Sequence, residues 1–174
     1  MIAKTAAVCS EAELQGSVTV GERCAVHPGA SVRAAGGSIV LGERCFVEDG
    51  AVLTASEDMT IGRDNLFESG CDVRSRSVGD GNWFEPKATA LAGSVIGSNC
   101  LIGSGVVVAE GEIVPDNSIL VAVQTPQGDT RRVVRPQKDY IIKAHAALIQ
   151  KYTDIFSRGS KSPYALEKHH ELRQ

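Results

Sequence analysis

Two segments of nearly the same sequence constrain the fold of this chain more than any other feature. Residues 20–25 and 41–46 read Val-Gly-Glu-Arg-Cys-Ala and Leu-Gly-Glu-Arg-Cys-Phe. They are the best copies of a pattern made of an aliphatic residue, Gly or another turn-forming residue, two polar residues, a small residue or Asn, and a free position. The first position recurs at Val8, Leu14, Val20, Val26, Val32, Leu41, Val47, Leu53, Ile61, Phe67, Val73, Val78, Phe84, Ala90, Ile96, Ile102, Val108 and Val114. Such internal repetition predicts a repeat architecture.

A period of six fits neither a helix nor a simple alternating strand. In extended backbone, positions one and five of each hexapeptide point to the same side, and position six points to the other. Three short faces joined by turns make a triangular coil of about 18 residues, and parallel coils stack at roughly 4.8 Å. We therefore expect an all-β solenoid, a parallel β-helix of hexapeptide repeats with about seven coils, over residues 1–123.

The register predicts three columns of inward-facing side chains. Val20, Leu41, Ile61, Val78 and Ile96 form the first; Val26, Val47, Phe67, Phe84 and Ile102 the second; Val32, Leu53, Val73, Ala90 and Val108 the third. Each member of the first column precedes a glycine. A stack of glycines suggests a sharp corner, because a residue without Cβ makes such a turn at low cost.

The composition limits the partners and the compartment. Hydrophobic residues make up 43% of the chain but aromatic residues only 5%, so we expect one domain with an aliphatic core. A net charge of −3 argues against a nucleic-acid or anionic-membrane partner. No apolar run reaches the roughly 18–20 residues that a membrane span needs, and residues 1–13 lack a signal-peptide core. These features predict a cytoplasmic protein that does not insert into membranes.

Four of the five cysteines fall at position five of the repeat, where a small inward-facing residue is expected. They are Cys24, Cys45, Cys71 and Cys100. Buried free cysteine behaves as a small hydrophobic residue, and the chain has no Cys-x-x-Cys pair, so a core role is favoured over metal binding. Only Cys9, at a second position, is expected to react with reagents in solution.

Position six should form an apolar stripe on the outside of the coils. On one face it is occupied by Ala25, Phe46, Leu66, Trp83 and Leu101. An aligned patch of this kind normally meets another surface. That surface is either the C-terminal helix of the chain or another subunit, and the sequence favours neither. We take Phe46, Leu66, Trp83 and Leu101 as the candidate protein interface.

The repeat ends before the C-terminus. The turn-rich sequence Gln124-Thr-Pro-Gln-Gly-Asp129 predicts a connecting loop over 124–136. Apolar residues at three- and four-residue spacing then predict a helix over 137–158, long enough to lie along the whole stack of coils. We expect the polar segment 159–174 to be a flexible tail. Within it, Ser162-Pro163 is a candidate phosphorylation site, and His169-His170 suits a solvated tail better than a metal site.

Hexapeptide β-helices carry both zinc carbonic anhydrases and acyltransferases, so an enzyme is the alternative prediction. The anhydrase type needs several imidazoles between subunits of a trimer, and only His27 lies in the coils. An acyltransferase needs a positioned base, and His27 beside Pro28 fits a surface turn better. We predict no catalytic, cofactor-binding or metal-binding residue. A homotrimeric enzyme of either type remains the runner-up, and it rests on fold analogy alone.

Specific stretches of the chain resemble the dynactin subunit 6 family. They are Val18-Thr-Val-Gly, Val26-His-Pro-x-Ala30, Ile61-Gly-x-x-Asn-Leu-Phe-Glu-x-Gly-Cys71, Gly79-Asp-x-Asn82, Glu85-x-Lys-Ala88 and Arg135-Pro-Gln137. The resemblance covers nearly the whole chain and implies a left-handed coil. It also implies a non-catalytic subunit of the dynactin pointed-end complex, located in the cytoplasm and cytoskeleton. Such a subunit pairs with dynactin subunit 5, contacts the pointed-end actin-related protein, and supports dynein-driven cargo transport on microtubules.

Overall fold

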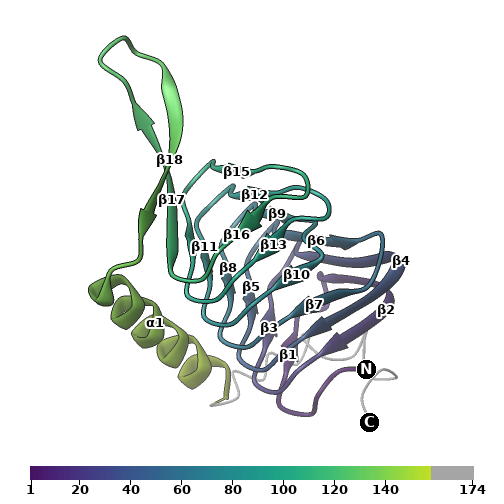
Figure 1. Cartoon of the computed structure of the whole chain (residues 1–174). Coiled ribbons are helices and arrows are strands. Elements are labelled where there is room, and N and C mark those ends of the chain that lie inside the picture. Colours follow the sequence, from purple (N-terminus) through teal and green to yellow (C-terminus); the bar gives the residue numbers. More distant parts are fainter. Residues whose placement is uncertain (158–174) are drawn as a thin grey trace.

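The chain winds into a parallel β-solenoid with one helix along its side and a hairpin at its end (Figure 1). The computed structural model describes residues 1–157. The predicted tail and its candidate residues Ser162, His169 and His170 lie outside the described residues.

The first sheet forms one side of the solenoid. Its order is β1 (Ala7–Val8), β3 (Ala25–Val26), β5 (Phe46–Val47), β8 (Leu66–Phe67), β11 (Trp83–Phe84), β14 (Leu101–Ile102), β17 (Ser118–Gln124) and β18 (Thr130–Pro136). The pairings from β1 to β17 are parallel. The chain therefore completes about six turns between the first and last parallel strands, against the roughly seven coils that the repeats predict.

A second sheet forms the other two sides, because the long strands β2 (Glu13–Val20) and β4 (Ser31–Leu41) pass round the corner between them. One side stacks β6 (Val52–Ala55), β9 (Asp72–Val73), β12 (Thr89–Ala90) and β15 (Val107–Val108) onto β4. The other stacks β7 (Met59–Ile61), β10 (Ser77–Val78), β13 (Val95–Ile96) and β16 (Ile113–Val114).

The three predicted columns are confirmed by the register of the strands. Val47 pairs with Val26 and Phe67, Leu53 pairs with Val73, and the other members follow in the same way. All fifteen predicted residues are at most 3% exposed, and the rings of Phe67 and Phe84 stack at 4.9 Å. Apart from these two rings, the predicted columns consist of aliphatic side chains, in line with the low aromatic content.

The glycines that follow the first-column residues allow adjacent turns to pack closely and do not form a special turn. A Cβ added to Gly42 would lie 2.6 Å from the carbonyl oxygen of Gly62 on the next turn, although Gly42 does not have a positive φ. The positive φ angles at this corner belong instead to the second polar position of the repeat, as at Arg23, Arg44 and Asp64. The expectation of a glycine turn is therefore wrong in its mechanism, since the constraint is the distance between adjacent turns.

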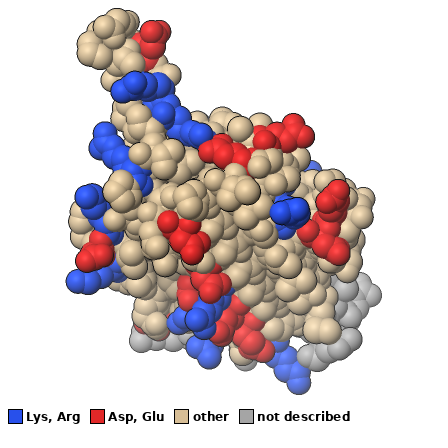
Figure 2. Space-filling model, viewed as in Figure 1, with Lys and Arg blue, Asp and Glu red and all other residues tan. Residues whose placement is uncertain are grey.

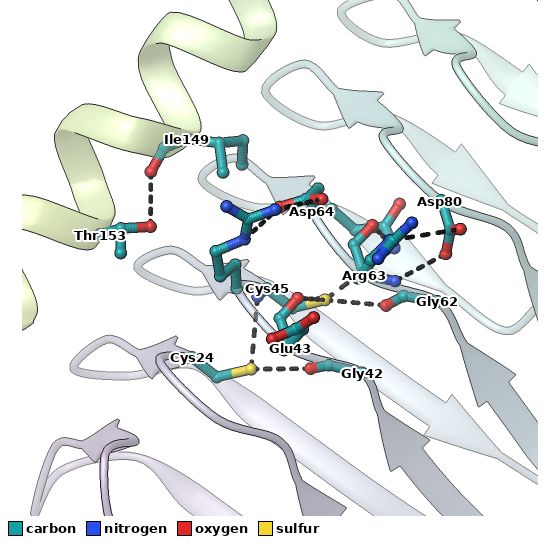
Figure 3. A network of polar contacts seen from close by, with 12 residues as sticks. Cys24, Gly42, Glu43, Cys45, Gly62, Arg63, Asp64, Asp80, Ile149 and Thr153 are labelled. Carbon is teal, nitrogen blue, oxygen red and sulfur yellow. Dashed lines mark hydrogen bonds and ion pairs between the residues drawn. The ribbon is translucent and has the colours of Figure 1, made fainter.

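The position-five residues fasten the same corner to the next turn (Figure 3). The thiol of Cys24 donates to the Gly42 carbonyl at 2.9 Å, and that of Cys45 donates to the Gly62 carbonyl at 3.1 Å. Asn65 continues the series by donating to the Gly79 carbonyl at 2.9 Å. These contacts satisfy carbonyls that face into the corner, which explains why the position takes either Cys or Asn.

The segment 124–136 differs from the predicted loop. Residues 130–136 form β18, which pairs antiparallel with β17 from Ser118↔Pro136 to Gln124↔Thr130. Gly128 adopts a φ of 90° and donates to the Thr125 carbonyl, which closes the turn. The turn residues were identified correctly, but β17 continues beyond the last full turn of the solenoid and so offers an edge on which the chain folds back.

The helix α1 spans Asp139–Ser157, within the predicted range 137–158. It lies alongside the first sheet (Figure 1). Ile149 is 3% exposed and packs against the outer side of that sheet. No helix among residues 1–157 combines the length and apolar character that crossing a bilayer requires.

Candidate functional site

The predicted apolar stripe runs along the outside of the first sheet, and α1 lies over it. Its members are neighbours in register on successive strands: Ala25, Phe46, Leu66, Trp83 and Leu101. Phe46 and Leu66 are fully buried, Leu101 is 6% exposed and Trp83 is half-buried. Of the two alternatives for this stripe, the structure places the chain's own helix there. A partner therefore has little access to these side chains while α1 is docked.

Aromatic rings hold the C-terminal half of the helix. The ring of Phe46 lies 5.1 Å from that of Tyr152 and 6.0 Å from that of Phe156, between centroids. His27 packs edge-on against Phe156 at 5.2 Å. The Tyr152 hydroxyl also donates to a carboxylate oxygen of Glu48, and burial together with that contact raises the pKa of Tyr152. The cluster fixes the helix to the solenoid by both apolar and polar contacts.

The N-terminal half of the helix covers Trp83 with a buried histidine. His145 is 6% exposed, and its ring lies 5.8 Å from that of Trp83. Burial lowers the pKa of His145 from 6.5 to about 4, so the imidazole is neutral at physiological pH. A cleft of about 300 Å³ lies beside His145. Arg44 and Asp64 also line this cleft and form an ion pair, with 2.7 Å between Nε of Arg44 and Oδ1 of Asp64.

A row of carboxylates borders the helix-covered stripe. Each carboxylate comes directly after a stacked core residue: Glu48 after Val47, Glu68 after Phe67 and Glu85 after Phe84. The three carboxylates therefore lie on adjacent turns. Burial raises the pKa of Glu68, and the charges of Glu48 and Glu85 add to the effect. Two of these carboxylates also fasten turns, because Glu48 accepts from the Ser69 amide and Glu85 from the Ser104 amide.

The face formed by β7, β10, β13 and β16 is not covered by any described element. Its outward side chains, in register, are Thr19, Val40, Thr60, Ser77, Val95 and Ile113. Ile113 is 71% exposed and Val40 is 42% exposed. None of the six is charged, and most are β-branched. Figure 2 shows few charged side chains across the middle of this side. We call this column of six residues the uncharged face.

The residues weighed for catalysis do not come together. His27 lies under the helix, with its Nδ1 at 3.8 Å from an Asp49 carboxylate oxygen. His145 belongs to the N-terminal half of the helix itself, where its ring packs against Trp83. Among residues 1–157, no group of three or more His, Cys, Asp or Glu side chains is arranged to hold a metal ion. A cleft of about 350 Å³ near Arg74, Ser75 and Arg76 contains no histidine.

Sequence reasoning missed two features of these surfaces. It did not assign His145 to the contact between helix and solenoid, although this residue lies on the helix face that carries Leu148, Ile149 and Tyr152. A polar residue within an apolar helical stripe was the available signal. It also did not find β18, because Arg131-Arg132-Val133-Val134 does not alternate polar and apolar residues and the short segment follows Gly128 and ends in Pro136.

Comparisons with known proteins agree on both fold and family. A family model, "Bacterial transferase hexapeptide (six repeats)", matches residues 77–110. Dynactin subunit 6 of Xenopus tropicalis is 32% identical over 163 residues, which cover 82% of this chain and 79% of that protein. Dynactin subunit 6 of Dictyostelium discoideum is 30% identical over 166 residues, which cover 92% and 87% of the two chains.

Solved structures add support for the architecture. The crystal structure of a hexapeptide transferase family protein from Anaplasma phagocytophilum matches 91% of this chain and 91% of its own, with a TM-score of 0.79. Its sequence identity is 19%, so this likeness shows the fold alone. The family follows from the sequence relatives, which match at 30–32% identity over most of both chains. The chain therefore belongs to the dynactin subunit 6 family.

Proposed function

We propose that this chain is a non-catalytic structural subunit of the dynactin pointed-end complex. In this role it pairs with dynactin subunit 5, adjoins the pointed-end actin-related protein and other dynactin subunits, and supports dynein-driven cargo transport in the cytoplasm and cytoskeleton. Its curated relatives bear the name dynactin subunit 6. Its described histidines do not meet, because His27 packs against Phe156 near the C-terminal end of α1, whereas His145 belongs to the N-terminal half of α1 and packs against Trp83.

The main structural observation in support of this proposal is the uncharged face. Six adjacent turns present side chains without a formal charge, so bringing a second protein onto them removes no ion from water. β-Branched side chains on a sheet lose little rotamer freedom when they are covered. A second β-helix offers a sheet of the same strand spacing and a similarly flat surface. The occupant that fits best is therefore the related β-helix subunit, dynactin subunit 5.

The test is co-purification of this chain with dynactin subunit 5 after co-expression. Val95→Arg places a charge in the centre of the uncharged face and should weaken the pairing by about tenfold or more. Thr89→Arg is the matched control, since it makes the same charge change on β12, the preceding strand in the sequence, which belongs to another side of the solenoid. This control should pair normally, and both variants should unfold at the same denaturant concentration as the unmodified chain.

Two results would overturn the proposal. One is equal loss of pairing in both variants, or in neither, because the uncharged face would then have no special role. The other is recovery of the chain as a homotrimer with stoichiometric zinc that is lost on His27→Ala. That result would point to the carbonic-anhydrase-like enzyme, with its site between subunits.

A further inference from the structure

The hairpin of β17 and β18 projects from the end of the solenoid as a two-stranded arm (Figure 1). Only Ile119 and Leu120 of β17 pair with the preceding strand β14. The part of β17 from Val121 to Gln124 pairs with β18 alone. β18 is the last strand of its sheet, so its other side faces no described strand.

The hydrogen bonds at the two ends of the arm show which backbone groups are free. Gln137 donates to the Asn117 carbonyl at 2.8 Å, and Thr125 donates to the Asp129 carbonyl at 2.7 Å. In an antiparallel ladder, bonded and non-bonded pairs alternate. The odd-numbered residues of β18 therefore bond to β17, and the N–H groups of Arg132 and Val134 point to the free edge. In agreement, the carbonyl of Leu120 turns away from β18 and accepts from the Gly103 amide at 2.7 Å.

The free edge is strongly basic. The chain carries a net charge of −3, yet residues 130–138 contain Arg131, Arg132, Arg135 and Lys138 and no acidic residue. Arg132 binds the Glu112 carboxylate through two contacts of 2.7 Å and holds the base of the arm to the last turn. Neither Arg131 nor Arg135 makes an ion pair with any residue from 1 to 157. Figure 2 shows Lys and Arg side chains extending along the arm.

Side chains on one face of the arm combine this charge with apolar surface. The register places Arg135 beside Ile119, Val133 beside Val121, and Arg131 beside Val123. Residues directly opposite each other in a ladder share a face of the sheet. Val133 therefore lies between two arginines on β18, with a row of aliphatic neighbours on β17.

We propose that β18 binds an extended acidic segment of a partner protein, which adds to the sheet as a further strand. The free N–H groups of Arg132 and Val134 donate to the backbone of that segment. Two carboxylates four residues apart pair with Arg131 and Arg135, and an apolar side chain midway between them covers Val133. A second copy of the same edge is a poor occupant, since antiparallel pairing would set arginines opposite each other. This inference does not depend on whether the chain is a subunit of dynactin.

The probe is a short fluorescent peptide with the core Glu-Ser-Val-Ser-Glu, which places both glutamates and the valine on one face of the added strand. It is titrated against the full chain by anisotropy. Arg131→Glu with Arg135→Glu should weaken binding by about tenfold or more. Lys4→Glu with Lys151→Glu is the control, because it changes the net charge equally at two exposed lysines outside the arm. Its affinity should stay within about twofold of the unmodified chain.

Strand addition is tested separately from charge. Val134→Pro removes one free N–H group while leaving the bonds to β17 in place, because proline is tolerated on an edge strand. The same peptide with alternate N-methylated amides blocks strand pairing without changing the protein. Both changes should weaken binding by about tenfold.

Three results would refute the inference. They are no binding of the acidic peptide to the unmodified chain, equal binding of the N-methylated peptide, and equally tight binding of a single-stranded RNA oligonucleotide. Dimerisation of the chain through β18 at the concentrations used would assign the edge to a second copy instead. None of these results bears on pairing with dynactin subunit 5 through the uncharged face.

Discussion

Acidification from neutral pH to about pH 4 should weaken the docking of α1 on the solenoid. His145 is buried as a neutral imidazole between the helix and Trp83, and burial lowers its pKa from 6.5 to about 4. A detached helix exposes this side chain and restores its ordinary pKa. Between these two pKa values the detached state binds more protons than the docked state, so protonation favours detachment.

The magnitude follows from the two pKa values. Their difference of about 2.5 corresponds to about 3 kcal/mol. Above pH 6.5 the group has no effect on docking, because it is neutral in both states. The docking free energy then falls by about 2 kcal/mol at pH 5 and by about 3 kcal/mol as the pH approaches 4. Glu68 acts in the opposite direction, because its pKa is raised in the folded protein.

Hydrogen exchange of the α1 amides across this pH range, corrected for intrinsic rates, measures the effect. His145→Gln is the comparison, since glutamine keeps a hydrogen-bond donor and does not titrate. The contribution of Glu68 is common to both proteins and cancels in the difference. The reasoning fails if both proteins lose helix protection equally between pH 7 and about pH 4.

Three further predictions test the packing. Phe46→Ala should lower the free energy of unfolding by about 3–5 kcal/mol in urea denaturation, because the ring is fully buried against Tyr152; a loss below about 1 kcal/mol would mean that the helix does not depend on it. Gly42→Ala should lower the free energy of unfolding by about 3 kcal/mol or more, because the added Cβ would lie 2.6 Å from the Gly62 carbonyl oxygen. Gly50→Ala should lower it by only about 1–2 kcal/mol, because Gly50 has a φ of 68° but open space around it. Equal melting temperatures of the two variants would refute the close-packing argument. Ellman's reagent should modify only Cys9 in the native protein and all five thiols after denaturation, and rapid reaction of a second native thiol would show that a corner is open.

The repeat made the interior of the solenoid predictable. Each inward position is set by the alternation of side chains and by the need to stack on the turn below, so Val47 and Phe67 could be aligned from their places in the repeat. The same logic assigned Cys24 and Cys45 to the core. These features depend on local periodicity alone, which one sequence contains in full.

The exterior was less predictable because it depends on which distant segment of the chain, or which partner, covers each outer face. An apolar stripe through Phe46 and Leu66 indicates that something covers it, but helix and partner present the same chemistry to those side chains. Only the position of α1 decides between them. β18 was missed for a related reason: its pairing partner is the unused edge of β17, and the extension of β17 past the last turn is not visible in the repeat.

The placement of α1 limits where partners can bind to the solenoid. One of the three sides lies beneath the helix, and the side of β9 and β12 carries ion pairs such as Arg74–Asp72 at 2.6 Å, which a flat partner would have to desolvate. The uncharged face and the arm of β17 and β18 remain accessible to partners. They differ in chemistry, since one removes aliphatic surface from water and the other pairs charges, so their salt dependence should differ. Rising ionic strength should weaken binding to the arm but leave pairing through the uncharged face almost unchanged, which separates the two surfaces without any substitution.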